Sequence, residues 1–497
     1  MHQESTKASY SQILKTTSIF GSVKIFSLLI NIFKSKIIAV FLGPQGMGVF
    51  GLLSYPLTLA VQLFGLGINT SGIPEIAKQE REKGLAETLY VIKYWNRVAG
   101  LIGTLAVFLF APAISTWSFG DESYAWAFRL LSSVVFISVI GNEYETILRG
   151  LREIKMVAKA GFYSALAGFL LSIPFYYFWG IYGILTVIFI TALALSVVNY
   201  LYVRKLKLSV AKIPVKDVFL RGKQMVIMGI FVVLGDLIFT VIITFVNTYI
   251  RKHGGVEDVG LFQACNQLTN SSINLVLMAM AADFFPKLSS YKGNWTKIKE
   301  VATQQVEIAI LLSTPIIVGM IIFAPTIIRI LLSADFISIT EPISWFLFGT
   351  VFRISSWAIN FVILANGDSK LYTISVIINN SMLLPLYCIG YTLGGITGMA
   401  KAYVLVVLIY STILYFIVHK KYGFSYEKSF FKLLVIGALL SLFTLIVSVM
   451  FDKGLIVYIL QALALIITLV FSVRNINSKT DIISKIKSKI TKNGSIQ

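Results

Sequence analysis

The sequence predicts an all-α polytopic membrane protein of about fourteen transmembrane helices, arranged as two pseudo-symmetric six-helix lobes plus two C-terminal helices. Composition is the first reason, because 57% of the 497 residues are hydrophobic and only 13% are charged. A soluble domain is nearer a quarter charged. The second reason is that apolar stretches of about 20 residues, enough to cross a bilayer, recur along the whole chain. The third is an internal repeat.

The apolar stretches give the predicted spans in order. They are 18–42, 47–70, 91–114, 125–147, 160–179, 181–203, 224–250, 259–285, 303–332, 342–365, 371–391, 396–418, 432–450 and 455–473. The polar N-terminus has no signal-peptide cleavage pattern, so the first span is expected to remain in the protein.

Positive charges between the spans predict the topology. Nearly all the Lys and Arg residues outside the spans fall in one alternate set of loops, which includes both termini, whereas the other set holds only Arg251, Lys252 and Lys453. Positive loops stay on the cytoplasmic side, so both termini are predicted to be cytoplasmic. The net charge of +20 therefore reports topology and contact with anionic lipid, and it does not indicate a nucleic-acid partner.

Four short matches recur in the same order at a nearly constant interval of about 213 residues. GVFGLLSY from Gly48 recurs as GLFQACNQ from Gly260, Pro74 as Pro286, Phe110-Ala111-Pro112 as Phe323-Ala324-Pro325, and the glycine at Gly180 as Gly395. A repeat of six spans keeps both copies in the same orientation, which predicts two lobes related by an axis along the membrane normal. The predicted domains are residues 1–210, 211–422, and 423–497 with two extra spans and a basic cytoplasmic tail.

Four spans at matching places in the repeats carry a narrow polar stripe. The candidate cavity residues on these stripes are Lys24, Asn31 and Lys34 in span 1, Gln62 and Asn69 in span 2, Asn247 in span 7, and Gln263, Asn266, Asn270 and Asn274 in span 8. Charges and amides are costly in hydrocarbon, so such a stripe faces protein or water. The symmetric placement predicts one central substrate cavity. Hydrogen bonding between helices is the alternative.

Charged residues inside other spans add to this prediction. Arg353 lies near the middle of span 10, too deep to reach the head groups easily, and is assigned to the same cavity. Asp236 is the acid predicted deepest in a span, where it would pair with a lysine of span 1 or bind the proton or cation that drives transport. Glu143 and Glu145 lie close to two arginines and are interpreted as members of structural ion pairs.

Enzyme signatures are missing from the sequence. It has neither a phosphate-binding Gly-rich loop nor a nucleophile elbow. The three histidines lie outside the spans, and the only cysteines, Cys265 and Cys388, lie inside them. Catalytic residues, a metal site, a cofactor and a disulfide framework are therefore not expected.

Two segments resemble a known family. The run KIIAVFLGPQGMG from Lys36 to Gly48 resembles the first-helix signature of bacterial polysaccharide flippases of the Wzx type, and VGLFQA from Val259, continuing to FPKLS from Phe285, is similar to their eighth-span region. The resemblance implies the multidrug/oligosaccharidyl-lipid/polysaccharide (MOP) exporter superfamily, with a V-shaped pair of lobes. It implies translocation of undecaprenyl-pyrophosphate-linked oligosaccharide from the inner to the outer leaflet of the bacterial cytoplasmic (inner) membrane, for O-antigen, lipopolysaccharide or other surface polysaccharide.

The resemblance also implies a cationic central cavity lined by the first two spans of each lobe, which Lys24 and Lys34 match. Span 8 departs from this expectation, because it offers amides where some relatives have arginines. The implied partners are the lipid-linked oligosaccharide, membrane lipids, a polysaccharide polymerase and a chain-length regulator, with no nucleic acid.

Three alternative functions stay open. A multidrug cation exporter on the same fold would favour an acidic cavity, whereas the predicted spans hold more cations than acids. A murein-precursor flippase shares the two extra C-terminal spans. A membrane glycosyltransferase or polymerase would need acids on sizeable outer loops, and the predicted outer loops are the shortest in the chain.

Overall fold

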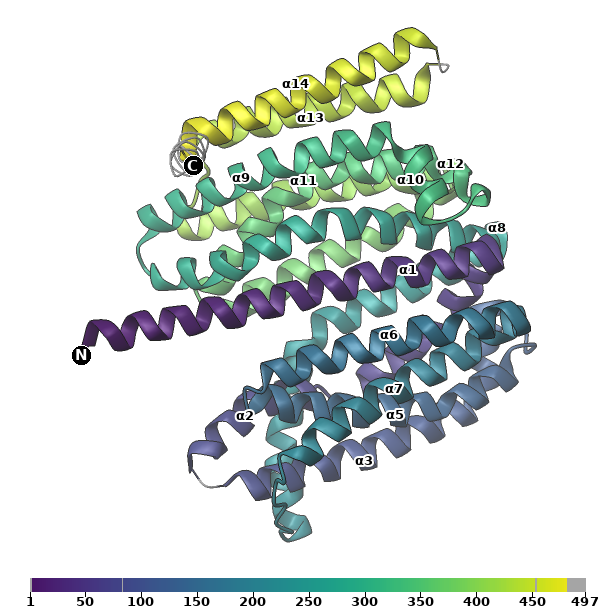
Figure 1. The fold of residues 1–497 in the computed structure, drawn as a ribbon, viewed down its shortest axis with the longest axis vertical. Coiled ribbons are helices and arrows are strands. Elements are labelled where there is room, and N and C mark those ends of the chain that lie inside the picture. The colour runs from purple at the N-terminus through teal and green to yellow at the C-terminus, as the bar shows by residue number, and fades with distance from the viewer. Residues whose placement is uncertain (1, 83, 452–453, 481–497) are drawn as a thin grey trace, which may run out of the picture. The chain divides into compact units, whose positions relative to one another are not determined.

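The computed structural model describes residues 2–82, 84–451 and 454–480, with backbone alone for residues 2–29, 31, 80–82, 282, 479 and 480. The elements in chain order are α1 (His2–Phe64), α2 (Ile68–Glu82), α3 (Leu85–Leu109), α4 (Ala111–Phe119), α5 (Ala125–Gly150), α6 (Ile154–Trp179), η1 (Gly180–Tyr182), α7 (Gly183–Lys205), α8 (Val215–Ser290), α9 (Trp295–Ile322), α10 (Ala324–Leu331), η2 (Ala334–Ile339), α11 (Thr340–Ala365), α12 (Ser369–Tyr422), α13 (Lys428–Met450) and α14 (Leu455–Thr480). Helices are the only regular structure in the described ranges, which confirms the all-α prediction (Figure 1).

The longest helices are each two arms joined at a glycine. α1 breaks at Gly43 (φ 62°, ψ −165°) and α8 breaks at Gly255 (φ 90°, ψ −179°). α12 breaks at Gly394 and Gly395, the second with φ 58°. Glycine adopts positive φ without a Cβ clash, which lets the chain leave one helical arm and begin the next.

These breaks explain how the helices relate to the predicted spans. The arms on either side of each break match spans 1 and 2, 7 and 8, and 11 and 12. Among the described residues, nine helices are long and apolar enough to cross a membrane, or ten when the bent pair α3 and α4 counts as one span. Several of these helices hold two predicted spans each, so the number of fourteen crossings stays a prediction.

Equivalent positions of the sequence repeat have matching backbone geometry. Gly180 (φ 54°, ψ −130°) and Gly395 (φ 58°, ψ −146°) adopt the same unusual conformation. Phe110 (φ −88°, ψ 8°) and Phe323 (φ −91°, ψ 9°) end their helices before a proline in the same way. The short sequence matches therefore mark places where the chain changes direction alike, which supports the repeat.

The chain forms two compact units, residues 1–264 with 331–336 and the remaining residues. The first arm of α8 belongs to the first unit, because Trp95 Nε1 donates to the Val218 carbonyl at 3.1 Å and Arg221 pairs with Glu87 at 2.8 Å. The units thus differ from the predicted boundary after residue 210. The domain division of the repeat stays a prediction.

Within the first unit, α3, α5, α6 and α7 lie side by side and α1 packs on α6 (Figure 1). Small residues bring α1 and α8 into backbone contact. A Cβ on Gly48 would lie 1.9 Å from the Val256 carbonyl oxygen, and one on Gly260 would lie 1.8 Å from the Pro44 carbonyl oxygen. Only glycine permits this approach.

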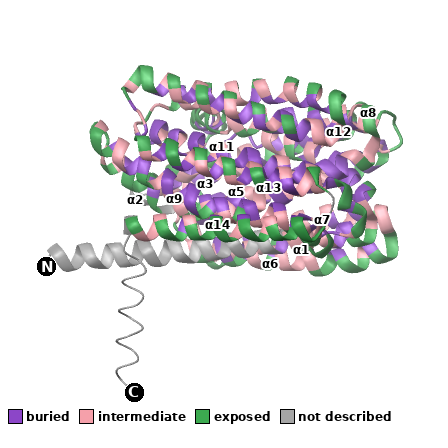
Figure 2. Cartoon of the chain, turned by 90° about the horizontal axis from the view of Figure 1, so that it is seen from above, coloured by how far each residue is buried: buried purple, intermediate pink, exposed green. Residues whose placement is uncertain are grey.

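In the second unit, α11 is the central helix, packed against α9, α12 and α13. The apolar window of Ala334–Ala365 is 67% buried, the largest share among the described helices that could span a membrane (Figure 2). The segment just before α13 is bonded to α11, because the Tyr426 hydroxyl donates to the Ser355 carbonyl at 2.9 Å.

The predicted topology can be tested by cysteine labelling in a Cys265→Ala/Cys388→Ala background. We expect Glu122→Cys to react with a membrane-impermeant maleimide from outside intact cells, and Lys292→Cys to react only after permeabilisation. Both positions are exposed, and the loop charges place them on opposite sides. Labelling of both positions from outside would contradict the topology.

Candidate substrate site

The clearest polar cluster of the second unit is centred on Arg353 of α11. Its Nη1 donates to Asn270 Oδ1 at 2.8 Å and its Nη2 donates to Asn274 Oδ1 at 2.7 Å. The two asparagines are four residues apart on the second arm of α8, so they lie on one face of the helix. The structure therefore brings together three of the residues that the sequence predicted for the cavity.

This cluster carries a positive charge with no acidic partner among the described residues. Arg353 is half-buried, and no ion pair within the described ranges includes it. Both amide oxygens are used to hold the guanidinium, so the amide NH₂ groups of Asn270 and Asn274 are left as donors. A cation surrounded by N–H donors has the chemistry of an anion receptor.

Two turns after Arg353 and on nearly the same face, hydrogen bonds join α11 to α12. Asn360 Nδ2 donates to the Tyr410 hydroxyl of α12 at 3.2 Å, and Ser375 Oγ donates to Asn360 Oδ1 at 3.3 Å. Ser356 is satisfied within the helix by the Arg353 carbonyl at 3.0 Å. These contacts hold α11 against α12 in the segment that follows Arg353.

Lys34 is the described cation of the predicted first-span stripe. It is half-buried in the first unit, and its Nζ donates to Thr191 Oγ1 of α7 at 3.5 Å, opposite Gly168 of α6. No carboxylate pairs with it in the described part of the chain. The side chains of Lys24 and Asn31 lie outside the described residues, so their assignment stays a prediction.

Four of the remaining predicted amides, Gln62, Asn69, Asn247 and Gln263, lie in the first unit. Gln62 Oε1, Asn69 Oδ1, both amide atoms of Asn247 and Gln263 Nε2 are buried without a hydrogen-bond partner in the ranges that the structure describes. The Gln263 side chain lies against the backbone of Gly51. Asn266 is half-buried. Direct interhelical hydrogen bonds, the alternative role, are not made by these particular atoms.

The sequence profile of the polysaccharide biosynthesis protein family matches residues 37–341, which is more than half of the chain. The chain belongs to this family. No curated protein sequence matches the chain at a significant level.

Solved structures show the fold of this family member. A multidrug resistance MATE family transporter of the MOP superfamily aligns with a TM-score of 0.68 and 18% identity over 84% of this chain and 99% of that chain. The lipid II flippase MurJ aligns with a TM-score of 0.69 and 14% identity over 92% and 99%. A MOP superfamily transporter from Pyrococcus furiosus aligns with a TM-score of 0.59 and 16% identity over 88% and 96%. The fold is therefore MATE/MOP-like, as predicted.

In this polysaccharide biosynthesis protein, the side chain of Asp236 is exposed on α8, and its coupling role stays a prediction. Glu143 is 0% exposed, and Glu307 is 2% exposed. Neither carboxylate oxygen of Glu143 accepts a hydrogen bond from a described residue. The position of Asp236 along its helix could be counted from the sequence, but the face on which it lies could not.

The ion-pair interpretation holds for one of the two neighbouring acids. Glu145 pairs with Arg149 one turn later on α5. Glu143 does not, because it points to α3, where Lys93 and Arg97 are the charges that act on it. Glu143 is therefore a buried acid that the sequence did not mark as a candidate site.

A polar cavity of about 400 Å³ between α2, α3 and α8 is a second feature that was not predicted from the sequence. Glu75, Gln79 and Arg221 line it. Gln79 donates to Glu75 at 3.1 Å. This cavity contains none of the predicted cavity residues. Its polar groups lie on helix turns near loops, where the sequence gives no reason to expect anything but solvent exposure.

Proposed function

We propose that this protein is a flippase that moves an undecaprenyl-pyrophosphate-linked oligosaccharide from the inner to the outer leaflet of the bacterial cytoplasmic membrane by alternating access. The observation that carries the proposal is the Arg353 cluster. Its charge lies on a helix with an apolar, membrane-spanning composition and has no carboxylate partner among the described residues. An unpaired charge in such a place is costly unless a ligand of opposite sign compensates it.

The chemistry of the substrate fits the two kinds of polar group in the chain. Pyrophosphate is an anion that Arg353 and Lys34 can bind through charge-assisted hydrogen bonds. Sugars need neutral donors and acceptors, which the amides of Asn247, Gln263 and Asn266 provide. Membership of the polysaccharide biosynthesis protein family and the MOP-like fold support the same assignment.

The alternatives fit the cluster less well. A multidrug cation exporter would place a positive ligand beside an uncompensated arginine, which is unfavourable at short distance in low dielectric. A murein-precursor flippase carries an equally anionic lipid, and the similarity to MurJ in fold is compatible with it. A glycosyltransferase or polymerase would need a catalytic constellation, and no such motif stands in the sequence.

We also propose a topology, two moving lobes, a coupling-ion site and partner proteins. Both termini are cytoplasmic, the repeats 1–210 and 211–422 act as the two moving lobes, and Asp236 binds the coupling ion. A polysaccharide polymerase and a chain-length regulator receive the translocated product.

The lysines of the first span test the proposed path. In a strain lacking its own flippase, Lys24→Gln/Lys34→Gln should lose most surface glycan at normal protein level, because a cation facing an anion in a partly dry site contributes strongly. Lys24→Arg/Lys34→Arg should keep much of it, since arginine also binds phosphate. Lys36→Gln, on another face of the helix, is the charge control.

A second control separates structure from function at Lys34. Thr191→Val removes the described partner of Lys34 but keeps the charge, so it should retain activity. Full surface glycan in the Lys24→Gln/Lys34→Gln variant would overturn the cationic path. Equal loss in Thr191→Val would show that Lys34 serves the packing of α7 instead.

A further inference from the structure

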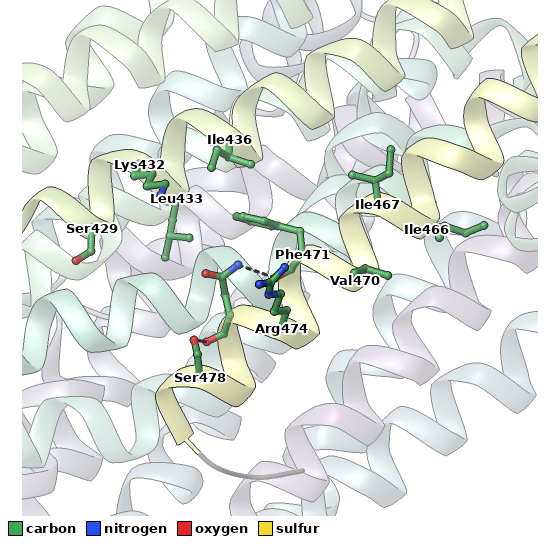
Figure 3. Close-up of a pocket in the computed structure, with 11 residues that line it drawn as sticks. Ser429, Lys432, Leu433, Ile436, Ile466, Ile467, Val470, Phe471, Arg474 and Ser478 are labelled. Atoms are coloured by element: carbon green, nitrogen blue, oxygen red, sulfur yellow. Dashed lines mark hydrogen bonds between the residues drawn. The ribbon is translucent and has the colours of Figure 1, made fainter. Parts of the chain in front are cut away.

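The C-terminal helices α13 and α14 enclose a groove of about 800 Å³ that is separate from the Arg353 cluster. Lys432 of α13 and Arg474 of α14 line it, together with Leu433 and Phe471 (Figure 3). We propose that this groove binds an anionic phospholipid of the surrounding membrane, with its phosphate between the two cations and its acyl chains along the apolar lining.

The charges that line the groove favour an anionic ligand. None of the residues that line it is acidic. Lys432 and Arg474 are both exposed, and neither forms an ion pair with another residue inside the described ranges. Two cations without a counter-charge complement an anionic headgroup better than a zwitterionic one, which brings its own positive charge.

The polar neighbours do not neutralise these cations. Asn475 Nδ2 donates to the Phe471 carbonyl at 2.8 Å, and Ser478 Oγ donates to the Asn475 carbonyl at 2.9 Å. Both side chains are thus satisfied within α14. Lys432 and Arg474 remain as the donors that a phosphate would meet.

The apolar lining of the groove favours a ligand with acyl chains. Ile466, Ile467 and Val470 line the groove and are 56%, 53% and 59% exposed. On a helix, Ile466 lies about 12 Å from Arg474 along the axis. The groove is therefore cationic where the apolar segments of α13 and α14 end and apolar farther in, which matches an amphiphile standing in one leaflet.

The predicted topology gives the leaflet. The segment before α13 and the segment after Arg474 belong to the loops that are rich in Lys and Arg, so the phosphate end lies at the cytoplasmic surface. Basic pockets between transmembrane helices on that side commonly bind anionic lipid. The inference does not depend on the identity of the transported substrate.

Native mass spectrometry of the purified full chain tests the proposal. The protein is incubated in mixed micelles that contain phosphatidylglycerol or phosphatidylcholine and is then transferred to the spectrometer. The wild type should retain phosphatidylglycerol selectively. Lys432→Gln/Arg474→Gln should lower that retention by roughly 30-fold, because each cation near a membrane surface contributes to anionic-lipid binding. Lys420→Gln/Lys428→Gln, which removes the same charge outside the groove, should retain lipid as the wild type does.

Several results would overturn the proposal. They are equal retention of both lipids by the wild type, unchanged retention of phosphatidylglycerol in Lys432→Gln/Arg474→Gln, and equal loss in the control pair. A dimer that this variant dissociates, with no bound phospholipid, would show that a second copy covers the groove. A thermal melt without lipid checks that all variants are folded alike.

Discussion

Arg353→Gln should lower the surface polysaccharide that the protein restores in a flippase-deficient strain by about 10- to 100-fold, at normal protein level. The glutamine removes the positive charge, and a hydrogen bond to a charged group is worth about 1.5–3 kcal/mol. Arg353→Lys should keep part of the activity, because lysine supplies the charge without the planar fork that holds Asn270 and Asn274. Arg329→Gln, at an exposed position of α10, is the matched control.

A second variant tests whether the missing counter-charge matters. Asn274→Asp keeps the size of the side chain but places a carboxylate on an atom that accepts from Arg353 at 2.7 Å in the wild type. The resulting ion pair should leave the protein at least as stable to heat, yet lower glycan export as strongly as Arg353→Gln. Asn266→Asp, which has no arginine partner among the described contacts, should do less harm. Full export in both Arg353→Gln and Asn274→Asp would contradict an anion-receptor role.

Gly260→Ala should strongly destabilise the protein. Its Cβ would lie 1.8 Å from the Pro44 carbonyl oxygen, a backbone atom that cannot rotate away. Overpacking commonly costs about 1–3 kcal/mol, and a backbone collision belongs at the upper end. Gly48→Ala, with a Cβ 1.9 Å from the Val256 carbonyl oxygen, should behave alike. Thermal unfolding in detergent and the amount of inserted protein measure the effect.

The control for this experiment is a glycine with space around it. A Cβ on Gly161 of α6 meets nothing within 4 Å, so Gly161→Ala should be neutral or slightly stabilising, as alanine favours the helix. Equal melting temperatures for Gly260→Ala and Gly161→Ala would contradict the close crossing of α1 and α8.

The fold was predictable because its signals are local. Apolar runs marked the helices, and the repeated glycines at Gly180 and Gly395 marked turns of the same geometry. The candidate site was predictable only in part. The spacing of Asn270 and Asn274 put both on one face of a helix, but their partner Arg353 lies on another helix far along the chain. Only packing brings the three together.

Helix rotation explains why the face of each acid could not be predicted from the sequence. Glu143 and Glu145 are two residues apart, so they point to roughly opposite sides of α5. One pairs with Arg149 and the other is fully buried. In the same way, Asp236 lies deep along its helix but on an exposed face. Position along a span can be counted from sequence, whereas the face depends on the neighbours.

Translocation in proteoliposomes tests the proposed function most directly. Wild type and Arg353→Gln would be reconstituted with undecaprenyl-pyrophosphate-linked oligosaccharide labelled on the glycan, and an impermeant glycan-cleaving enzyme would report which leaflet holds the label. The wild type should equilibrate the label much faster than empty vesicles, while Arg353→Gln should stay near the empty-vesicle rate. An uncharged analogue without the pyrophosphate should move slowly in both. Wild-type vesicles that move the labelled lipid no faster than empty ones, or that move the uncharged analogue equally fast, would contradict the account.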